Sequence, residues 1–150
     1  MVGIGYDSHR FADRRPLILG GVEIDHPQGL VGHSDADVLT HAVIDAVLGA
    51  GGRGDIGTLF PDDDPQWEGA DSIDLLRTAV GTIAGAIDNI DATVICEQPR
   101  LGPYREEMER ILGEATSARV SVKATSNEGM GWIGRGEGIA CIAVASLRSE

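Results

Sequence analysis

The sequence lacks several features that would place it in a familiar class of protein. Its 150 residues include only two cysteines, no CxxC pair, and no run of about 18 apolar residues that could span a membrane. A disulfide framework, a cysteine-based metal site and a transmembrane helix are therefore not expected. Cys96 and Cys141 each lie in an apolar, strand-like stretch, so we expect both to be reduced core residues.

Positive charge is also scarce. The chain carries 12 Lys and Arg against 24 Asp and Glu, a formal net charge of −12. A nucleic-acid partner needs a basic face that displaces counterions, so nucleic-acid binding is not expected. No signal or transit peptide is recognisable at the start, which favours a cytoplasmic protein without a membrane partner. An anionic substrate would have to be neutralised by metal ions, helix N-termini and a few arginines.

The length and the order of patterns predict one α/β domain over residues 1–150. Alternating or short apolar runs predict strands over residues 1–9, 17–20, 92–96, 120–124 and 139–146. Helical spacing predicts helices from Ser34 to the glycines at 49–52, over 72–86 with Ser72 as cap, and over 104–115. Polar or glycine-rich loops are expected at 55–68 and 129–138. Strands and helices in this order predict an α/β (α+β) sandwich.

The helix after His33 carries the most unusual pattern. Ser34 can cap its first free N–H groups, with Asp37 three residues later completing a capping box. Most of the following residues are apolar and at helical spacing, so the helix should be largely buried. Asp37, His41 and Asp45 nevertheless recur every four residues and form one polar stripe. His41 is therefore either part of a structural hydrogen-bond network or a metal ligand held by neighbouring carboxylates.

A second pair of candidate ligands lies near the start of the chain. Asp7 and His9 are separated by one residue on a predicted strand, so their side chains leave the same face. With His41 they would form an Asp-His-His set, and three protein ligands leave one position open, as in catalytic zinc sites. The same set also suits iron(II). For Asp7 and His9 alone, a local ion pair is an equal alternative.

The glycine-rich segment near the end of the chain does not fit a known nucleotide-binding motif. Gly129, Gly131 and Gly134 have the spacing of a dinucleotide-binding loop, but no helix is expected after them and the chain ends too soon for a distal acidic residue. A loop between strands is therefore favoured. The flanking residues 123–128 offer hydroxyls, backbone N–H groups and Glu128, which could hold a phosphate or a hard cation, but taken alone they favour an exposed turn.

Five ordered motifs together resemble one family. They are Gly-Tyr-Asp-Ser-His at 5–9, His-Ser-Asp-Ala-Asp at 33–37 with His41, Gly-Asp-Ile-Gly at 54–57 with Phe-Pro-Asp at 60–62, Lys-Ala-Thr-Ser-Asn-Glu at 123–128, and Gly-Arg-Gly-Glu-Gly at 134–138. This series resembles the 2-C-methyl-D-erythritol 2,4-cyclodiphosphate synthase family of the non-mevalonate isoprenoid pathway. The resemblance spans nearly the whole chain, from Gly3 to about Leu147.

The resemblance implies a fold, an assembly and a reaction. The fold would be one mixed four-stranded sheet plus a small extra hairpin, with helices on one face. Three such sheets would pack around a threefold axis in a homotrimer with active sites at the subunit interfaces. The enzyme would be a lyase that cyclises 4-diphosphocytidyl-2-C-methyl-D-erythritol 2-phosphate and releases CMP. An isoprenoid diphosphate could bind on the trimer axis, near Glu137.

The resemblance also implies roles for individual residues. Zinc would be held by Asp7, His9 and His41, and a second divalent ion, Mg²⁺ or Mn²⁺, by Glu128. His33 and Ser126 would act on the reacting phosphates. Other substrate contacts would come from Ser8, Ser34, Asp55, Ile56, Gly57, Phe60, Asp62, Thr125, Trp132 and Arg135. The cytidine end would be bound by Cys96, Gln98, Pro99, Arg100, Leu101 and Gly102.

The sequence departs from the common family pattern in places. Ala36 replaces a frequent glycine, Ser126-Asn127 stands for Thr-Thr, Gly129-Met130 stands for Lys-Leu, and the segment around 86–89 is shorter. Two other functions remain as alternatives to the cyclase. A zinc hydrolase would release inorganic phosphate through metal-bound water, and a trimeric binding module would hold nucleotides or isoprenoid diphosphates without turnover.

Overall fold

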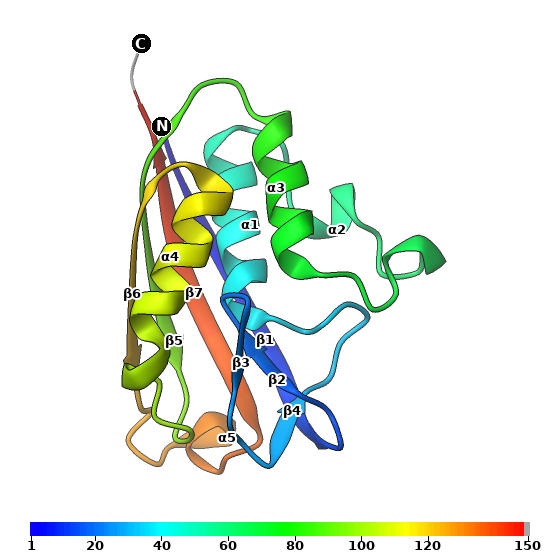
Figure 1. Ribbon diagram of the computed structural model, residues 1–150, viewed down its shortest axis with the longest axis vertical. Helices are drawn as coiled ribbons and strands as arrows, with labels where there is room; N and C mark the ends of the chain where they lie inside the picture. The colour runs from blue at the N-terminus through cyan, green and yellow to red at the C-terminus, as the bar shows by residue number, and fades with distance from the viewer. Residues whose placement is uncertain (149–150) are drawn as a thin grey trace.

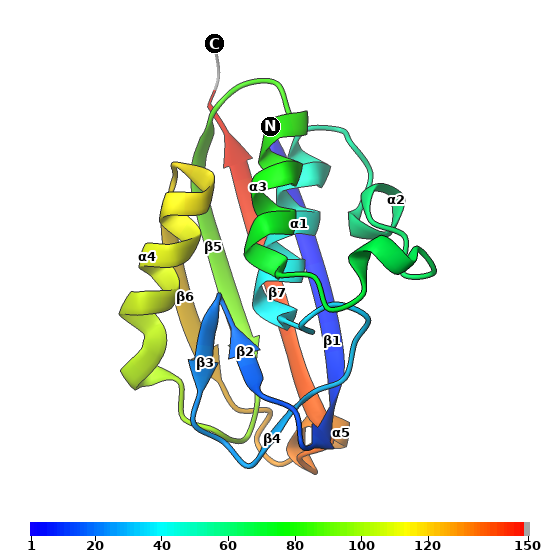
Figure 2. The same cartoon turned by 45° about the vertical axis from the view of Figure 1, so that its right-hand side comes forward.

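The computed structural model describes residues 1–148 and forms two layers, a sheet covered on one face by helices (Figures 1 and 2). The main sheet has five strands in the order β4-β1-β7-β5-β6. Their bounds are β1 Val2–Asp13, β4 Gln28–Leu30, β5 Ile87–Ile95, β6 Arg119–Thr125 and β7 Gly138–Leu147. Strands β5 and β6 run parallel, and the other neighbouring pairs are antiparallel. The mixed sheet was predicted with four strands, and the short edge strand β4 is the fifth.

The predicted extra hairpin is present. Strands β2 (Leu17–Leu19) and β3 (Val22–Ile24) pair antiparallel and form a separate two-stranded sheet. Gly20 and Gly21 connect them with φ angles of +57° and +76°. Two consecutive residues with positive φ are the requirement of a tight type I′ hairpin turn, which glycine meets without steric cost.

Three long helices cover the sheet: α1 (Val38–Ala50), α3 (Ser72–Thr82) and α4 (Arg105–Thr116). Helix α1 lies directly on β1 and β7, α3 packs on α1, and α4 lies over β6 (Figure 2). The loops predicted at 55–68 and 129–138 contain single turns of helix, α2 (Ile56–Leu59), η1 (Pro65–Trp67) and α5 (Gly131–Gly134), and η2 (Gly102–Tyr104) precedes α4. Within residues 1–148 no helix has the length and apolarity to cross a membrane.

The predicted N-caps of two helices were wrong, by three residues for α1 and by one residue for α3. Helix α1 is capped by Asp37, whose side chain accepts the Thr40 N–H, and not by Ser34. Helix α3 is capped by Asp71, which accepts the Ile73 N–H, and not by Ser72. Both serine hydroxyls instead contact His41. Helix α3 also ends at Thr82, four residues before the predicted end.

The glycines of β1 let the strand lie unusually close to α1. A Cβ atom placed on Gly5 would be 1.9 Å from the carbonyl oxygen of Ala42, and one on Gly3 would be 2.1 Å from that of Ala46. The alternate residues of β1 point to the other face, where Val2, Ile4 and Tyr6 are exposed by 70%, 70% and 55%. The helices therefore pack on the glycine face, and the apolar face is left uncovered.

We expect Gly5→Ala to lower the free energy of unfolding by about 3 kcal/mol or more, because backbone atoms of α1 block the added methyl group. Gly81→Ala is the matched control, since nothing lies within 4 Å of a Cβ atom there. In that helical position alanine should raise stability, by less than about 1 kcal/mol. Urea unfolding measures both. Equal stability of the two variants would contradict the close packing.

Candidate metal centre and active site

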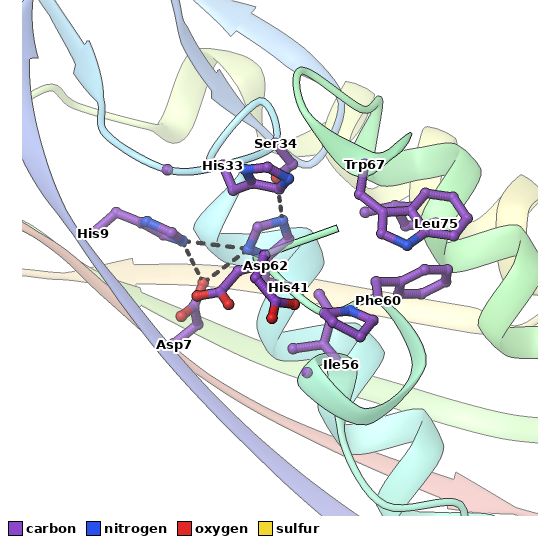
Figure 3. Close-up of a pocket in the computed structure, with 14 residues that line it drawn as sticks. Asp7, His9, His33, Ser34, His41, Ile56, Phe60, Asp62, Trp67 and Leu75 are labelled. Atoms are coloured by element: carbon purple, nitrogen blue, oxygen red, sulfur yellow. Dashed lines mark hydrogen bonds and ion pairs between the residues drawn. The ribbon is translucent and has the colours of Figure 1, made fainter. Parts of the chain in front are cut away.

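The predicted ligands Asp7, His9 and His41 lie together. One ligand atom from each residue can be chosen so that all three lie within 4.8 Å of one another. Asp7 Oδ2 is 2.8 Å from His9 Nε2 and 3.2 Å from His41 Nδ1, and the two imidazole nitrogens are 3.3 Å apart (Figure 3). The set comes from one strand and one helix, because residues 7 and 9 continue the face of β1 on which Gly3 and Gly5 approach α1.

A backbone contact orients the His9 imidazole. His9 Nδ1 lies 2.7 Å from the carbonyl oxygen of Val31. A carbonyl can only accept, so Nδ1 carries the proton, and in the neutral ring the lone pair of Nε2 is directed at Asp7 and His41. A neutral imidazole with its second nitrogen bound to a carbonyl is the usual state of a histidine that ligates a metal. The donor set therefore fits a divalent metal ion.

The ionisable groups of the triad shift one another's pKa values. Burial raises the pKa of the Asp7 carboxyl, but the hydrogen bonds and charges of His41 and His9 outweigh burial and lower it to about 2. Burial lowers the pKa of His9, and here too the neighbouring Asp7 carboxylate outweighs burial, so that the pKa is raised. The pair thus favours a carboxylate at position 7, which is the form that ligates metals.

A pocket of about 480 Å³ opens beside the triad. Of the predicted site residues it is lined by Asp7, His9, His33, Ser34, His41, Ile56, Gly57, Phe60 and Asp62 (Figure 3). Its walls also include residues to which the sequence analysis assigned no role, namely Gly32, Pro61, Asp63, Trp67 and Leu75. Trp67 meets Phe60 edge-on, with ring centroids 5.0 Å apart. The sequence could have indicated this apolar wall, because Phe60 and Trp67 are two aromatic residues in a polar loop of a chain with few aromatic residues.

Asp45 positions one side of this pocket. Its Oδ1 atom accepts the N–H of Ile56 at 2.7 Å and so fixes the start of α2. Burial raises the pKa of the Asp45 carboxyl, as do the nearby Asp55 and Asp7. Asp55 itself does not line the pocket: it is exposed and caps α2 by accepting the Thr58 N–H at 2.8 Å. His33 donates from Nε2 to the carbonyl of Asp64 at 3.0 Å and holds the loop that follows α2.

The other predicted site residues form a second group on the loops that follow β5 and β6. Cys96 N–H donates to the carbonyl of Thr125 at 3.0 Å. Glu97, which was not predicted, accepts the N–H groups of Asn127 and Gly129 at 2.8 and 3.3 Å. This group comprises Cys96, Gln98, Pro99, Arg100, Leu101, Gly102, Thr125, Ser126 and Glu128. Within the described chain none of them lines the pocket beside the triad.

Three predicted residues have other surroundings. Ser8 lies between Asp7 and His9 and therefore points to the opposite face of β1. With His9, Arg10, Trp132 and Glu137 it lines a cavity of about 200 Å³, so this cavity reaches the triad at His9. Arg135 pairs with Glu137, Nε to Oε2 2.8 Å.

The cysteines are buried and free, as predicted. Burial raises the pKa of the Cys96 thiol to about 11 and that of Cys141 further. Both thiols are therefore protonated and unreactive at neutral pH.

A mixed α/β fold that holds a carboxylate and two imidazoles at the edge of a pocket defines a candidate metal-dependent enzyme. The model of the YgbB family matches residues 1–148. The chain belongs to the YgbB family.

Two curated relatives of similar length carry the same name. The 2-C-methyl-D-erythritol 2,4-cyclodiphosphate synthase of Symbiobacterium thermophilum is 55% identical over 98% of both chains. The protein of that name from Enterococcus faecalis is 49% identical over 97% of both.

Solved structures agree with this family. A 2C-methyl-D-erythritol-2,4-cyclodiphosphate synthase in a CDP-bound form matches with a TM-score of 0.88 and 35% identity, over 99% of this chain and all of the other. The bifunctional IspDF of Campylobacter jejuni matches with a TM-score of 0.91 and 41% identity. That match covers 96% of this chain and 41% of the bifunctional one.

We expect the triad to bind one divalent metal ion, so His9→Ala should weaken Zn²⁺ binding by more than about 100-fold, since losing even an outer partner of a ligand costs roughly 10–100-fold. Isothermal titration of the metal-free protein with Zn²⁺ measures this. His26→Ala is the control, because His26 lies beside Phe11, with ring centroids 5.5 Å apart, and is not part of the triad. Equal affinities in the two variants would exclude the triad as the metal site.

Proposed function

We propose that the protein converts 4-diphosphocytidyl-2-C-methyl-D-erythritol 2-phosphate to 2-C-methyl-D-erythritol 2,4-cyclodiphosphate and CMP. One observation carries the proposal: in a chain of this family, Asp7, His9 and His41 direct their ligand atoms at one another at the edge of the 480 Å³ pocket. The site is therefore suited to an intramolecular phosphoryl transfer in isoprenoid precursor synthesis.

The reaction needs no protein nucleophile, because the 2-phosphate of the substrate attacks the β-phosphorus and CMP leaves. The protein contributes position and charge. The apolar wall of Ile56, Phe60 and Leu75 and the carboxylate of Asp62 suit a small branched polyol. An enclosed and correctly oriented attack can supply up to roughly 7–11 kcal/mol of the barrier through effective molarity.

Charge is the second requirement, since the chain is acidic and the substrate carries several phosphate charges. We assign zinc to Asp7, His9 and His41, and a second ion, Mg²⁺ or Mn²⁺, to Glu128. When bound, the two ions would polarise the β-phosphate and stabilise the leaving CMP. Glu128 is exposed in a left-handed backbone conformation with φ +54°, and its N–H donates to Ser126 Oγ at 3.2 Å. Ser126 and Glu128 are both exposed, so a phosphate and its cation can reach their side chains.

The cytidine end is assigned to the loops after β5 and β6. These loops lie at the same end of the sheet and are joined by the Glu97 carboxylate (Figure 1). In one chain, residues 96–102 and 125–128 of these loops do not line the pocket beside the triad, and the loop after β6 meets the triad at the cavity that Trp132 shares with His9. A complete site would therefore combine the triad and pocket of one copy with the two loops of a neighbouring copy.

A homotrimer meets this requirement. The face of the sheet opposite the helices exposes Val2, Ile4, Tyr6, Ile142 and Val144. Ile4 pairs with Val144 and Tyr6 with Ile142, so these side chains form one continuous patch on β1 and β7. An uncovered apolar patch of this kind supports an interface between copies of the chain. A cytoplasmic location and an isoprenoid diphosphate on the axis stay predictions from the sequence.

Phosphorus NMR of the purified protein with the substrate and Mg²⁺ tests the reaction. We expect equimolar CMP and cyclic diphosphate, abolished by chelation, restored by Zn²⁺, and lost in His41→Ala. Release of inorganic phosphate with solvent oxygen in the product would replace the cyclase by a zinc hydrolase. Binding without turnover, unaffected by His41→Ala, would replace it by a binding module.

Ile4→Glu tests the assembly. A carboxylate in the centre of the patch would be buried without a partner, so we expect the trimer to dissociate and the activity to fall at least about 100-fold. Sedimentation velocity measures the mass in solution. Thr78→Glu, on the exposed side of α3, is the control and should remain trimeric. A wild-type protein that sediments as a monomer with full activity would refute the assembly.

A further inference from the structure

The imidazole of His41 is held on the side away from the triad by two hydroxyl groups. Its Nε2 atom lies 2.8 Å from Ser72 Oγ and 3.0 Å from Ser34 Oγ. Its Nδ1 atom lies on the opposite side of the ring and faces Asp7 and His9. The aspartates one turn away on the same helix, Asp37 and Asp45, make their hydrogen bonds elsewhere. The serines, and not the carboxylates of the predicted stripe, are therefore the polar partners of His41.

Ser72 is itself held by a carboxylate. Its hydroxyl donates to Asp35 Oδ1, and its backbone N–H donates to Asp35 Oδ2 at 3.0 Å. Asp35 is fixed in turn, because Oδ1 accepts the Asp37 N–H at 3.1 Å and its own N–H donates to the carbonyl of Ala70 at 3.1 Å. Ser72 is completely buried at the first turn of α3. The group Asp35–Ser72–His41 thus joins three segments of the chain in one line of hydrogen bonds.

The protons available to these groups determine which atom donates and which accepts in each hydrogen bond of the line. A carboxylate only accepts, so the single hydroxyl proton of Ser72 is committed to Asp35. Ser72 Oγ can then only accept from His41, which requires a proton on Nε2. In the neutral ring that leaves the lone pair on Nδ1, directed at the triad. We propose that Asp35 and Ser72 are positioning residues, which hold His41 in the Nε2–H tautomer and thereby set the affinity of the triad for its metal.

The same arrangement leaves the hydroxyl proton of Ser34 without an acceptor on His41. With the proton of Nε2 on His41, Ser34 Oγ cannot donate to the ring, and its hydroxyl proton is available to an acceptor in the pocket that Ser34 lines. A phosphate oxygen is such an acceptor. The two serines on either side of Nε2 therefore have different tasks: Ser72 accepts from the ring, and Ser34 donates to the ligand.

The inference rests on the metal site of the proposed function but not on its reaction, so it is tested on the protein without substrate. Long-range proton–nitrogen NMR of the metal-free protein, at a pH where the ring is neutral, reports the tautomer of His41. We expect the proton on Nε2 in the wild-type protein. A proton on Nδ1 would overturn the proposal without any variant.

Two variants test the effect on the metal. In Ser72→Ala the acceptor is lost, and we expect a mixture of tautomers and a Zn²⁺ dissociation constant raised about 10–100-fold. In Asp35→Asn the amide can turn its NH₂ group toward Ser72, which lets the hydroxyl donate to Nε2 and shifts the proton of His41 to Nδ1. Thr78→Ala is the control, because its hydroxyl is exposed on the same helix and bonds only the carbonyl of Asp74.

The outcomes separate this inference from the proposed function. If the wild-type protein binds no Zn²⁺, the metal site itself fails. If the wild-type protein binds Zn²⁺ and Ser72→Ala binds it within threefold with an unchanged tautomer, Ser72 is only structural and this inference alone fails. If Ser72→Ala is too unstable to be measured, the Zn²⁺ affinity of Asp35→Asn and the tautomer of His41 in the wild-type protein decide the test.

Discussion

The contact on which the site depends is the close approach of β1 to α1. Gly3 and Gly5 have no side chains to hold the strand away from the carbonyl groups of Ala46 and Ala42. Residues on one face of a strand recur at every second position, so Asp7 and His9 follow the two glycines on the face that meets α1. The glycines thereby bring the two β1 ligands within reach of His41. A larger residue at either position would move both ligands together.

The acidic residues of this chain act largely as acceptors that fix loops. Asp37 is fully buried and accepts the N–H groups of Gly20, Gly21 and Thr40, so the hairpin turn is attached to the start of α1. Asp35 fixes the start of α3 and Asp45 the start of α2. Burial raises the pKa of Asp37, and the backbone donors offset part of that cost. Three carboxylates in or beside one helix therefore position three segments around the metal centre.

Local patterns and the family motifs were sufficient for most of the elements and for the three residues of the candidate metal site, but not for the details of the caps. The alternation in β1 and the periodicity of α1 are local signals, and the ligand set Asp7, His9 and His41 followed from them and from the family motifs. Ser34, Asp37, Asp71 and Ser72 are all good capping residues, and only tertiary contacts decide between them: the serines are used by His41, which leaves the aspartates to cap. Strand β4 has three residues and exists through its pairing with β1. Glu97 accepts from residues about 30 positions away, a partner that no local pattern specifies.

The two faces of β1 connect assembly to chemistry. Tyr6 and Asp7 are neighbours in sequence, yet one belongs to the exposed apolar patch and the other to the triad. A copy of the chain packed against the patch would therefore lie one strand's thickness from the metal ligands. The triad is complete within one chain, whereas residues 96–102 and 125–128 do not line the pocket beside it. If the proposed assembly forms, a single chain would hold all three candidate metal ligands while the whole substrate would need two copies, so metal affinity and turnover need not depend on assembly in the same way.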